Sequence, residues 1–221
     1  KKVWSKVASW ISNTFAIHRF LIPNSALLWG GAMCFRKEYL DQINLKITWK
    51  NVVYDDLTLT RILRERKEKS AFVFPAMAKR KIEMNFKEAL VWFVRQMTAV
   101  KFYHASWWKR TIEESTGLIC AFFLPLWIIL GMFFGLSITA VAFSSSIILF
   151  RILSGLLLYR SFGNQVNWRQ APKFFFIDVL AITFSLLVGI YTLRSQKIVW
   201  SGQEYYLSRE GGIIGIKQYD K

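Results

Sequence analysis

The sequence predicts a small α/β part followed by a bundle of transmembrane α-helices. Residues 1 to about 115 hold most of the charge, and the remainder is far more apolar. A wholly globular fold would have to bury about 40 nearly continuous apolar residues, more than an ordinary core helix contains. We expect four segments. The first is a partial α/β domain (1–84), and the second is an interfacial amphipathic helix region (85–115). About three transmembrane helices (116–193) and a polar C-terminal tail (194–221) follow.

The chain is strongly basic, with a net charge of +16 from 30 Lys and Arg against 14 Asp and Glu. No nucleic-acid motif accompanies this excess, so we expect no nucleic-acid partner. Cations that flank apolar segments are typical contacts to anionic headgroups, which makes membrane lipids the expected partners. Arginine and lysine also suit an anionic ligand such as a nucleotide diphosphate.

The two cysteines, Cys34 and Cys120, indicate neither a disulfide framework nor a metal cluster. The chain begins at Lys1 and shows no signal peptide. We expect it to be a fragment that lacks an amino-terminal portion.

The first elements mix apolar and basic residues. Residues 1–24 are consistent with an amphipathic helix that ends before Pro23. The apolar stretch Ser25 to Phe35 is interrupted by Gly30 and Gly31, which predicts a strand or turn where the backbone comes close to another group. A simple tight turn is the alternative.

A second helix is predicted to begin at the acid pair Asp55 and Asp56, because Leu59, Ile62 and Leu63 follow at helical spacing. Acidic side chains favour the positive end of a helix dipole, so either aspartate could simply cap this helix. The apolar run from Ala71 to Phe74 predicts a buried strand that stops at Pro75.

Asn85 and Glu88 form a predicted capping box at the start of a third helix. Aromatic residues near apolar segments are typical of a helix that lies in the membrane interface. The predicted apolar face holds Ala89, Leu90, Phe93, Val94 and Met97, and the aromatic rim holds Trp92, Tyr103, Trp107 and Trp108.

Three segments approach the ~20 residues needed to cross a bilayer, namely 116–136, 137–159 and 174–193. Arg151 and Asp178 fall inside two of them, and a pairing of these ions is one hypothesis for how their cost is offset. Three crossings would place the tail opposite the polar part. The alternative is that one segment is re-entrant or interfacial, and the distribution of Lys and Arg does not decide.

The polar residues form an ordered set, in which carboxylates are followed by cationic and amide side chains. A positioned carboxylate can take the proton of an attacking hydroxyl group, and Asp55 and Asp56 supply carboxylates. Arg, Lys, Gln or a metal ion can stabilise a departing diphosphate, and Arg95, Gln96 and Lys101 are the candidates.

Three stretches carry a family resemblance. Residues 29–36, Trp-Gly-Gly-Ala-Met-Cys-Phe-Arg, are similar to a glycine pair followed by a basic residue, and residues 55–59, Asp-Asp-Leu-Thr-Leu, are similar to an acidic motif. Residues 200–205 are similar to a Trp-x-Gly-x-x-Tyr ending. The chain thus resembles the carboxyl-terminal half of membrane-bound family 2 glycosyltransferases, especially the ceramide-glucosyltransferase-like branch, family 21.

This resemblance implies an α/β partial GT-A-like catalytic domain ahead of the transmembrane helices. By the same match, Asp56 is the catalytic base, Asp55 is its acidic companion, and Gly30 and Gly31 lie near the acceptor site. Segment 1–84 is then the acceptor-side part of that domain.

The third motif departs from the family pattern, which is Gln or Arg, two variable residues, then Arg and Trp. Counted from Gln96, the last two positions hold Ala99 and Val100. The run from Arg95 resembles a bacterial variant in which Lys101 supplies the cation. An ideal helix sets Arg95 and Lys101 about 120° apart, so the two need not both face the site.

The implied activity is inverting transfer of a hexose from a nucleotide-sugar donor to a lipid or membrane-associated acceptor, with the catalytic part on the cytoplasmic side. The family binds the donor and a divalent metal, Mg or Mn, through an Asp-x-Asp motif that this sequence lacks. We therefore expect the metal ligands to lie outside this chain, and these residues alone to be inactive.

Two alternatives remain open. One is a non-enzymatic membrane transport or scaffold protein, in which Asp55 caps a helix and Arg95 contacts lipid headgroups. The other is a processive polysaccharide synthase, against which the missing Trp of the third motif argues.

Overall fold

The computed structural model describes residues 2–21, 28–71, 83–132, 171–208 and 211–218, with a few helical positions between 142 and 157. This part of the chain is mostly helical and holds one antiparallel sheet in the order β1-β2-β3. Its elements are α1 (Lys2–Leu21), α2 (Lys37–Gln42), α3 (Leu45–Trp49), α4 (Asp55–Glu65), α5 (Phe86–Tyr103), α6 (Ala105–Met132), α8 (Ala171–Leu193), β1 (Lys197–Trp200), β2 (Gln203–Leu207) and β3 (Ile213–Gln218).

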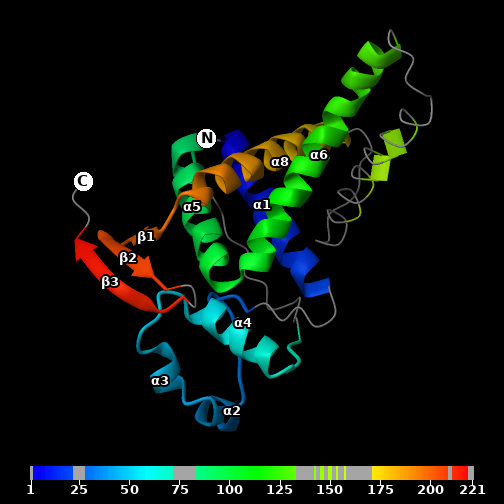
Figure 1. Cartoon of the computed structure of the whole chain (residues 1–221). Helices are drawn as coiled ribbons and strands as arrows, with labels where there is room; N and C mark the ends of the chain where they lie inside the picture. Colours follow the sequence, from blue (N-terminus) through cyan, green and yellow to red (C-terminus); the bar gives the residue numbers. More distant parts are fainter. Residues whose placement is uncertain are drawn as a thin grey trace.

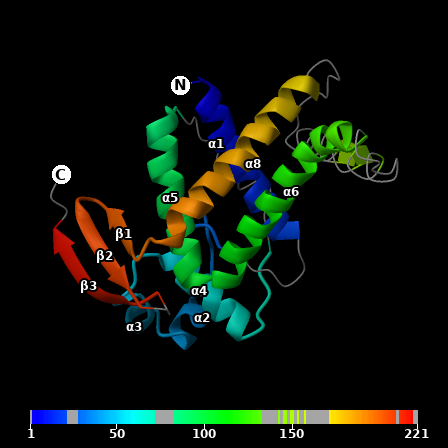
Figure 2. The same cartoon turned by 45° about the horizontal axis from the view of Figure 1, so that its top comes forward.

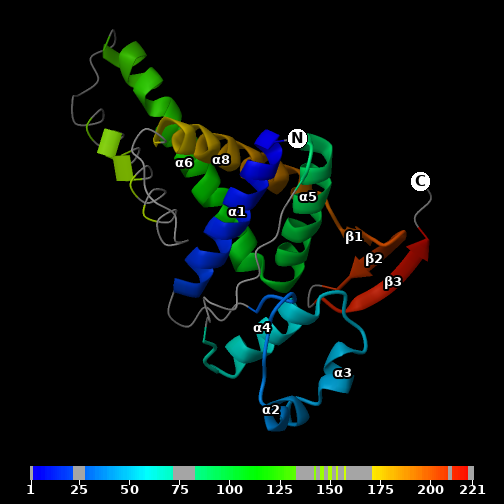
Figure 3. The same ribbon diagram turned by 180° about the vertical axis from the view of Figure 1, so that it is seen from behind.

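The long helices α1, α5, α6 and α8 pack together, and α2, α3 and α4 lie at one end of this group (Figure 1). The sheet lies beside the same end of α5, where α4 also packs, as Figures 2 and 3 show from two other directions. The acid pair and the C-terminal residues are therefore near each other in space although more than a hundred residues separate them.

Helix α5 connects two hydrophobic clusters. The first joins α5 to α4, the start of α6 and the sheet, and the second joins α5 to α1 and α8. Met97 packs against both clusters. The first comprises Leu57, Ala99, Val100, Tyr103, Trp107, Ile198 and Leu207, and the second Val7, Ala89, Ile177, Ala181, Phe184 and Val188.

Several predicted helices are confirmed. Helix α1 covers most of 1–24, and α4 begins at Asp55. The capping box at the start of α5 is present, because Asn85 Oδ1 accepts a 2.9 Å bond from the Glu88 N–H while Glu88 Oε2 accepts a 2.7 Å bond from the Asn85 N–H. The predicted apolar face of α5 packs in the second cluster.

The predicted boundary at 115/116 falls inside a helix. A corner at His104, which has the non-helical angles φ −145° and ψ 64°, ends α5. The His104 carbonyl then accepts bonds from the N–H groups of Trp107 and Trp108, which starts α6. Helix α6 runs without interruption through residue 116, so 85–115 contains parts of two helices.

The prediction that four aromatic residues form a rim in the membrane interface is wrong for two of them. Tyr103 and Trp107 are each only 5% exposed and belong to the first cluster. These two rings stabilise the junction of α4, α5 and the sheet instead of facing lipid.

Helix α1 was expected to belong to the α/β part, but it packs on α8. Trp10 Nε1 donates a 2.8 Å hydrogen bond to Oδ1 of the buried Asp178. Arg151 lies outside the described residues, so its pairing with Asp178 stays a prediction. Among the described residues of 1–84, the single β interaction is a bridge from Val52 to Gly212, and the strand predicted at 71–74 lies outside them except for Ala71.

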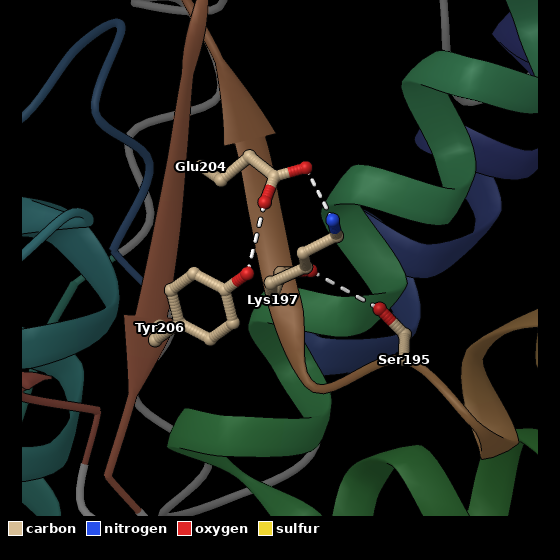
Figure 4. A network of polar contacts seen from close by, with 4 residues as sticks. All are labelled: Ser195, Lys197, Glu204 and Tyr206. Carbon is tan, nitrogen blue, oxygen red and sulfur yellow. Dashed lines mark hydrogen bonds and ion pairs between the residues drawn. The ribbon is translucent and has the colours of Figure 1, made fainter. Parts of the chain in front are cut away.

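Segment 194–221 was predicted to be a polar tail, yet most of it forms the sheet. Ser201 and Gly202 have φ of 52° and 75°, the left-handed pair that a tight two-residue hairpin requires. Glu204 on β2 accepts bonds from Lys197 Nζ and, at 2.9 Å, from the Tyr206 hydroxyl group (Figure 4). The bond from Lys197, followed by that from Tyr206, lowers the pKa of Glu204.

One helix among the described residues, over Pro172–Leu193, is long and apolar enough to cross a membrane. Of the other two predicted spans, the first lies mostly in α6 and the second falls almost wholly outside the described residues. Trp108 near the start of α6 donates a 2.9 Å bond to Thr192 Oγ1 near the end of α8. The start of α6 and the end of α8 therefore lie next to each other, at the end of the helix group where α4 and the sheet pack on α5.

Candidate functional site

The glycine pair forms a turn that is tied to α4. The Ala32 N–H donates a 3.0 Å bond to the Trp29 carbonyl, with Gly30 and Gly31 between them. The Gly30 N–H donates a 2.9 Å bond to Asp56 Oδ2, and the Leu28 N–H donates a 2.9 Å bond to Thr60 Oγ1. Residues 56 and 60 are one helical turn apart, so both bonds meet the same face of α4.

The close approach predicted at the glycines is confirmed for Gly30. A Cβ atom there would lie 3.2 Å from Asp56 Oδ2 and 3.5 Å from Asp55 Oδ1. At Gly31, the nearest atom to such a Cβ is Trp29 Cδ1 at 3.4 Å. Gly30 is therefore the member of the pair whose lack of a side chain lets the backbone lie this close to the two carboxylates.

The two acids also stabilise the first turn of α4. Asp55 Oδ1 accepts a 2.9 Å bond from the Asp56 N–H, and Asp56 Oδ1 accepts a 2.7 Å bond from the Leu57 N–H. The residue at the N-cap position is Tyr54 rather than an aspartate. Asp56 thus uses one carboxylate oxygen for the helix and the other for the glycine turn.

Asp56 is the more enclosed of the two acids, and Asp55 is exposed. Burial raises the pKa of Asp56 above its ordinary value, although the N–H groups of Gly30 and Leu57 act in the opposite direction. The negative charge of Asp55 raises this pKa further. A carboxylate with a raised pKa is a stronger base, as proton abstraction from a hydroxyl group requires.

Tyr54, which directly precedes the acid pair, is affected electrostatically by Arg95 of the third motif. Burial raises the pKa of Tyr54 to about 12, while the positive charge of Arg95 lowers it and the charge of Asp56 raises it. Arg95 on α5 and Asp56 on α4 therefore both act on one hydroxyl group. The Arg95 Nε atom is buried, and no hydrogen-bond partner for it is found among the described residues.

The other two candidates of the third motif differ from Arg95. Gln96 is half-buried on α5, and none of the hydrogen bonds between described residues joins it to the acid pair. Lys101 Nζ donates to three backbone carbonyl groups, those of Thr192 at 2.8 Å, Leu193 at 2.9 Å and Ser195 at 3.0 Å.

This arrangement gives Lys101 a different role from the predicted one. The carbonyls it binds are at and just beyond the C-terminal end of α8, which carries partial negative charge. An ammonium group has three donors, and all three are used. Its contacts therefore assign Lys101 to capping α8 and do not support a substrate contact.

Three site residues were missed from the sequence. Thr60 and Tyr54 stand beside the acid pair, and spacing on the predicted helix was the only signal for Thr60. Tyr103 was read as an interfacial aromatic residue, but its hydroxyl group contacts Val53 N at 3.3 Å and Tyr54 N at 3.5 Å.

A polar pocket of about 400 Å³ lies by the C-terminal half of α4. Arg64 lies over the Trp107 ring, 4.7 Å from its centroid, and its Nη1 is 3.2 Å from His104 Nδ1. None of the site residues predicted from the sequence lines this pocket. Its lining residues are Arg61, Arg64, Glu65, Tyr103, His104, Ala105 and Ser106.

Within the described part of the chain, no group of three or more His, Cys, Asp or Glu side chains is placed to hold a metal ion. The expected divalent metal, with ligands outside this chain, stays a prediction. Comparison with known proteins finds no matching family model, no matching curated protein and no matching solved structure. Any functional conclusion therefore depends on the residues and contacts described above.

Proposed function

We propose that this chain is the acceptor-side part of a membrane-bound inverting glycosyltransferase that moves a hexose from a nucleotide-sugar to a lipid or membrane-associated acceptor. One observation carries the proposal, which is the hydrogen bond from the Gly30 N–H to Asp56 Oδ2. It joins the glycine and acidic motifs, and the charges of Asp56 and Arg95 both affect the pKa of Tyr54.

In the proposed reaction, the Asp56 carboxylate takes the proton of the acceptor hydroxyl group as its oxygen attacks the anomeric carbon of the donor. The new C–O bond forms on the face opposite the diphosphate, and the bond to the diphosphate breaks with its electron pair. The anomeric configuration is inverted. The raised pKa of Asp56 favours the proton transfer, and the Gly30 N–H fixes the carboxylate in place.

Arg95 is the proposed cation for the negative charge that develops on the diphosphate. A guanidinium group forms charge-assisted, often bidentate bonds to phosphate oxygens. Arg95 is only half-buried, and no partner for its Nε atom is found among the described residues, which is compatible with such a contact by its guanidinium group. A divalent metal, when bound by residues outside this chain, would supply further positive charge to the same leaving group.

The proposed acceptor reaches this site from the cytoplasmic face of a bilayer. Helix α8 has the length and hydropathy of a membrane anchor, and the net charge of +16 suits a surface of anionic lipids. Helix α5 contacts α8 and also carries Arg95, so it connects the anchor directly to the site.

A non-enzymatic scaffold or transport protein is the second candidate. The observation in its favour is that both aspartates bond amides in the first turn of α4, as purely structural capping residues would. The two candidates differ in whether the intact protein binds and turns over a nucleotide-sugar. A processive polysaccharide synthase would give the same turnover but a polymeric product.

The test is a turnover assay of the full-length protein with a set of nucleotide-sugars and lipid acceptors. Transfer of one hexose to a lipid with inverted anomeric configuration is the expected result. Retained configuration would contradict the proposed single displacement. Absence of both donor binding and transfer across the set would favour the non-enzymatic candidate.

A further inference from the structure

We infer that the C-terminal sheet, β1 to β3, is a positioning part of the Asp56 site, held there by Tyr103 and Gly211. This inference rests on the proposed function of Asp56. It makes the sheet and Gly211 a structural requirement for transfer, whereas the sequence predicted a polar tail.

Tyr103 joins three parts of the chain through its hydroxyl group. The group donates a 2.8 Å bond to the Gly211 carbonyl and accepts bonds from the N–H groups of Val53 and Tyr54. Tyr54 immediately precedes Asp55, and its ring packs edge-on against that of Tyr103 with centroids 6.1 Å apart. Through a single atom, the end of α5 fixes both the C-terminal segment and the entry into α4.

Gly211 is the residue that allows this contact. Its φ of +80° lies in the left-handed region, where other residues are strained. A Cβ atom at this position would lie 2.7 Å from Cε1 and Cζ of Tyr103, closer than any real contact. The chain can therefore pass this close to the ring only with glycine at residue 211.

A second set of contacts joins the sheet to the residues before the acid pair. The Ile213 N–H donates a 3.0 Å bond to the Asn51 carbonyl, and Asn51 Nδ2 donates a 2.9 Å bond to the Ile213 carbonyl. Val52 and Gly212 form a β-bridge beside them. Asn51 and Val52 are thus held by the C-terminal segment directly, and Val53 and Tyr54 are joined to it through the Tyr103 hydroxyl group.

The sheet is fixed to α4 and α5 by buried side chains. Ile198 on β1 and Leu207 at the end of β2 are buried in the first cluster with α4 and α5. The bond from Lys197 to Glu204 links β1 to β2, whereas the bond from Tyr206 to Glu204 stays within β2 (Figure 4). Movement of the sheet would therefore move the backbone that positions Asp55 and Asp56.

The experiment compares Tyr103→Phe and Asn51→Ala with the unchanged full-length protein. Tyr103→Phe keeps the ring but removes the hydroxyl group, and Asn51→Ala removes a bond made by an exposed residue, so both should fold. We expect at least a tenfold faster amide exchange at Val53 and Tyr54, and a pKa of Asp56 closer to its ordinary value because water reaches it. The kcat should fall at least tenfold, with the KM for the donor unchanged.

Tyr206→Phe is the matched control. It also removes a tyrosine hydroxyl group, but one on β2 that bonds Glu204 and not residues 51–54. It should leave exchange at Val53 and Tyr54, the titration of Asp56 and the kcat unchanged. The inference is overturned if Tyr103→Phe also leaves exchange and the Asp56 titration unchanged, or if both change and kcat does not. Normal transfer by Asp56→Asn, with altered exchange in Tyr103→Phe, would instead refute the role of Asp56 and with it the positioning role of the sheet.

Discussion

The backbone N–H of Gly30 donates a 2.9 Å hydrogen bond to Oδ2 of Asp56, which lies 26 residues further along the chain. The same carboxylate uses Oδ1 for the first turn of α4. Asp56 is consequently fixed at both oxygens and enclosed beneath the glycine turn. An acceptor hydroxyl group near Gly30 would meet a carboxylate that is already oriented and whose pKa burial has raised.

Gly30→Ala is predicted to impair the site. The added Cβ would lie 3.2 Å from Asp56 Oδ2, so the carboxylate must move by a few tenths of an ångström and its bond to the turn weakens. Because transfer depends steeply on the placement of the base, we expect a roughly tenfold lower kcat/KM for the acceptor. Steady-state kinetics with varied acceptor measure this directly.

Gly31→Ala is the matched comparison. Its Cβ would meet Trp29 Cδ1 at 3.4 Å, which is close to ordinary contact, so its loss of activity should be clearly smaller. An equal or larger loss in Gly31→Ala would show that Asp56 does not explain the need for glycine here.

Lys101→Met is predicted to destabilise the fold without weakening donor binding. The variant leaves the carbonyl groups of Thr192, Leu193 and Ser195 without their cationic donor. Loss of such charge-assisted bonds costs about 1–3 kcal/mol of the free energy of unfolding. Denaturant unfolding in detergent measures this loss, and donor titration measures the affinity.

Lys87→Met serves as the control, because Lys87 is an exposed residue near the start of α5. Lys87→Met should change neither the free energy of unfolding nor the affinity for the donor. If Lys101→Met instead lowered donor affinity at unchanged stability, the capping role would be wrong and the predicted substrate contact would be right.

The C-terminal sheet and the acid pair are predicted to lie on the same side of the membrane, because Asn51 bonds Ile213 of β3 and Tyr103 bonds both Gly211 and Val53. In sealed vesicles of a Cys120→Ser protein, the exposed Cys34 and a cysteine in place of the exposed Ile214 should react with a membrane-impermeant thiol reagent from the same side. Reaction from opposite sides would support the prediction that the chain crosses the membrane three times. It would contradict the contacts between the sheet and the residues before Asp55.

Local signals explain what the sequence predicted correctly. The capping box of Asn85 and Glu88 and the acid pair at the start of α4 act within a single helical turn, so the helix starts were visible. The close approach at Gly30 was visible because a glycine inside an apolar stretch often marks a bend or a close backbone contact. The identity of the approaching group, Asp56, followed only from the resemblance and the structure together.

Contacts between distant residues explain what the sequence missed. Tyr103 binds a carbonyl 108 residues away, and Lys101 binds carbonyls 91 to 94 residues away, so neither role has a local pattern. Tyr103 was predicted to be an interfacial aromatic residue from its residue type, and Lys101 was predicted to be a substrate-binding cation from its place in the third motif. The hairpin did have a local signal in Ser201 and Gly202, but residues 200–205 were interpreted only as a family ending.

The role of Asp56 as the base is tested most directly by the transfer rate of the full-length Asp56→Asn protein with bound donor and saturating acceptor. The amide keeps the size of the side chain but cannot take a proton, whereas Asp41→Asn, on the exposed face of α2, makes the same change away from the site. We expect a loss of about 10²–10⁴-fold in Asp56→Asn with donor affinity retained, and no loss in Asp41→Asn. Near-normal transfer by Asp56→Asn would contradict the assignment of Asp56 as the base.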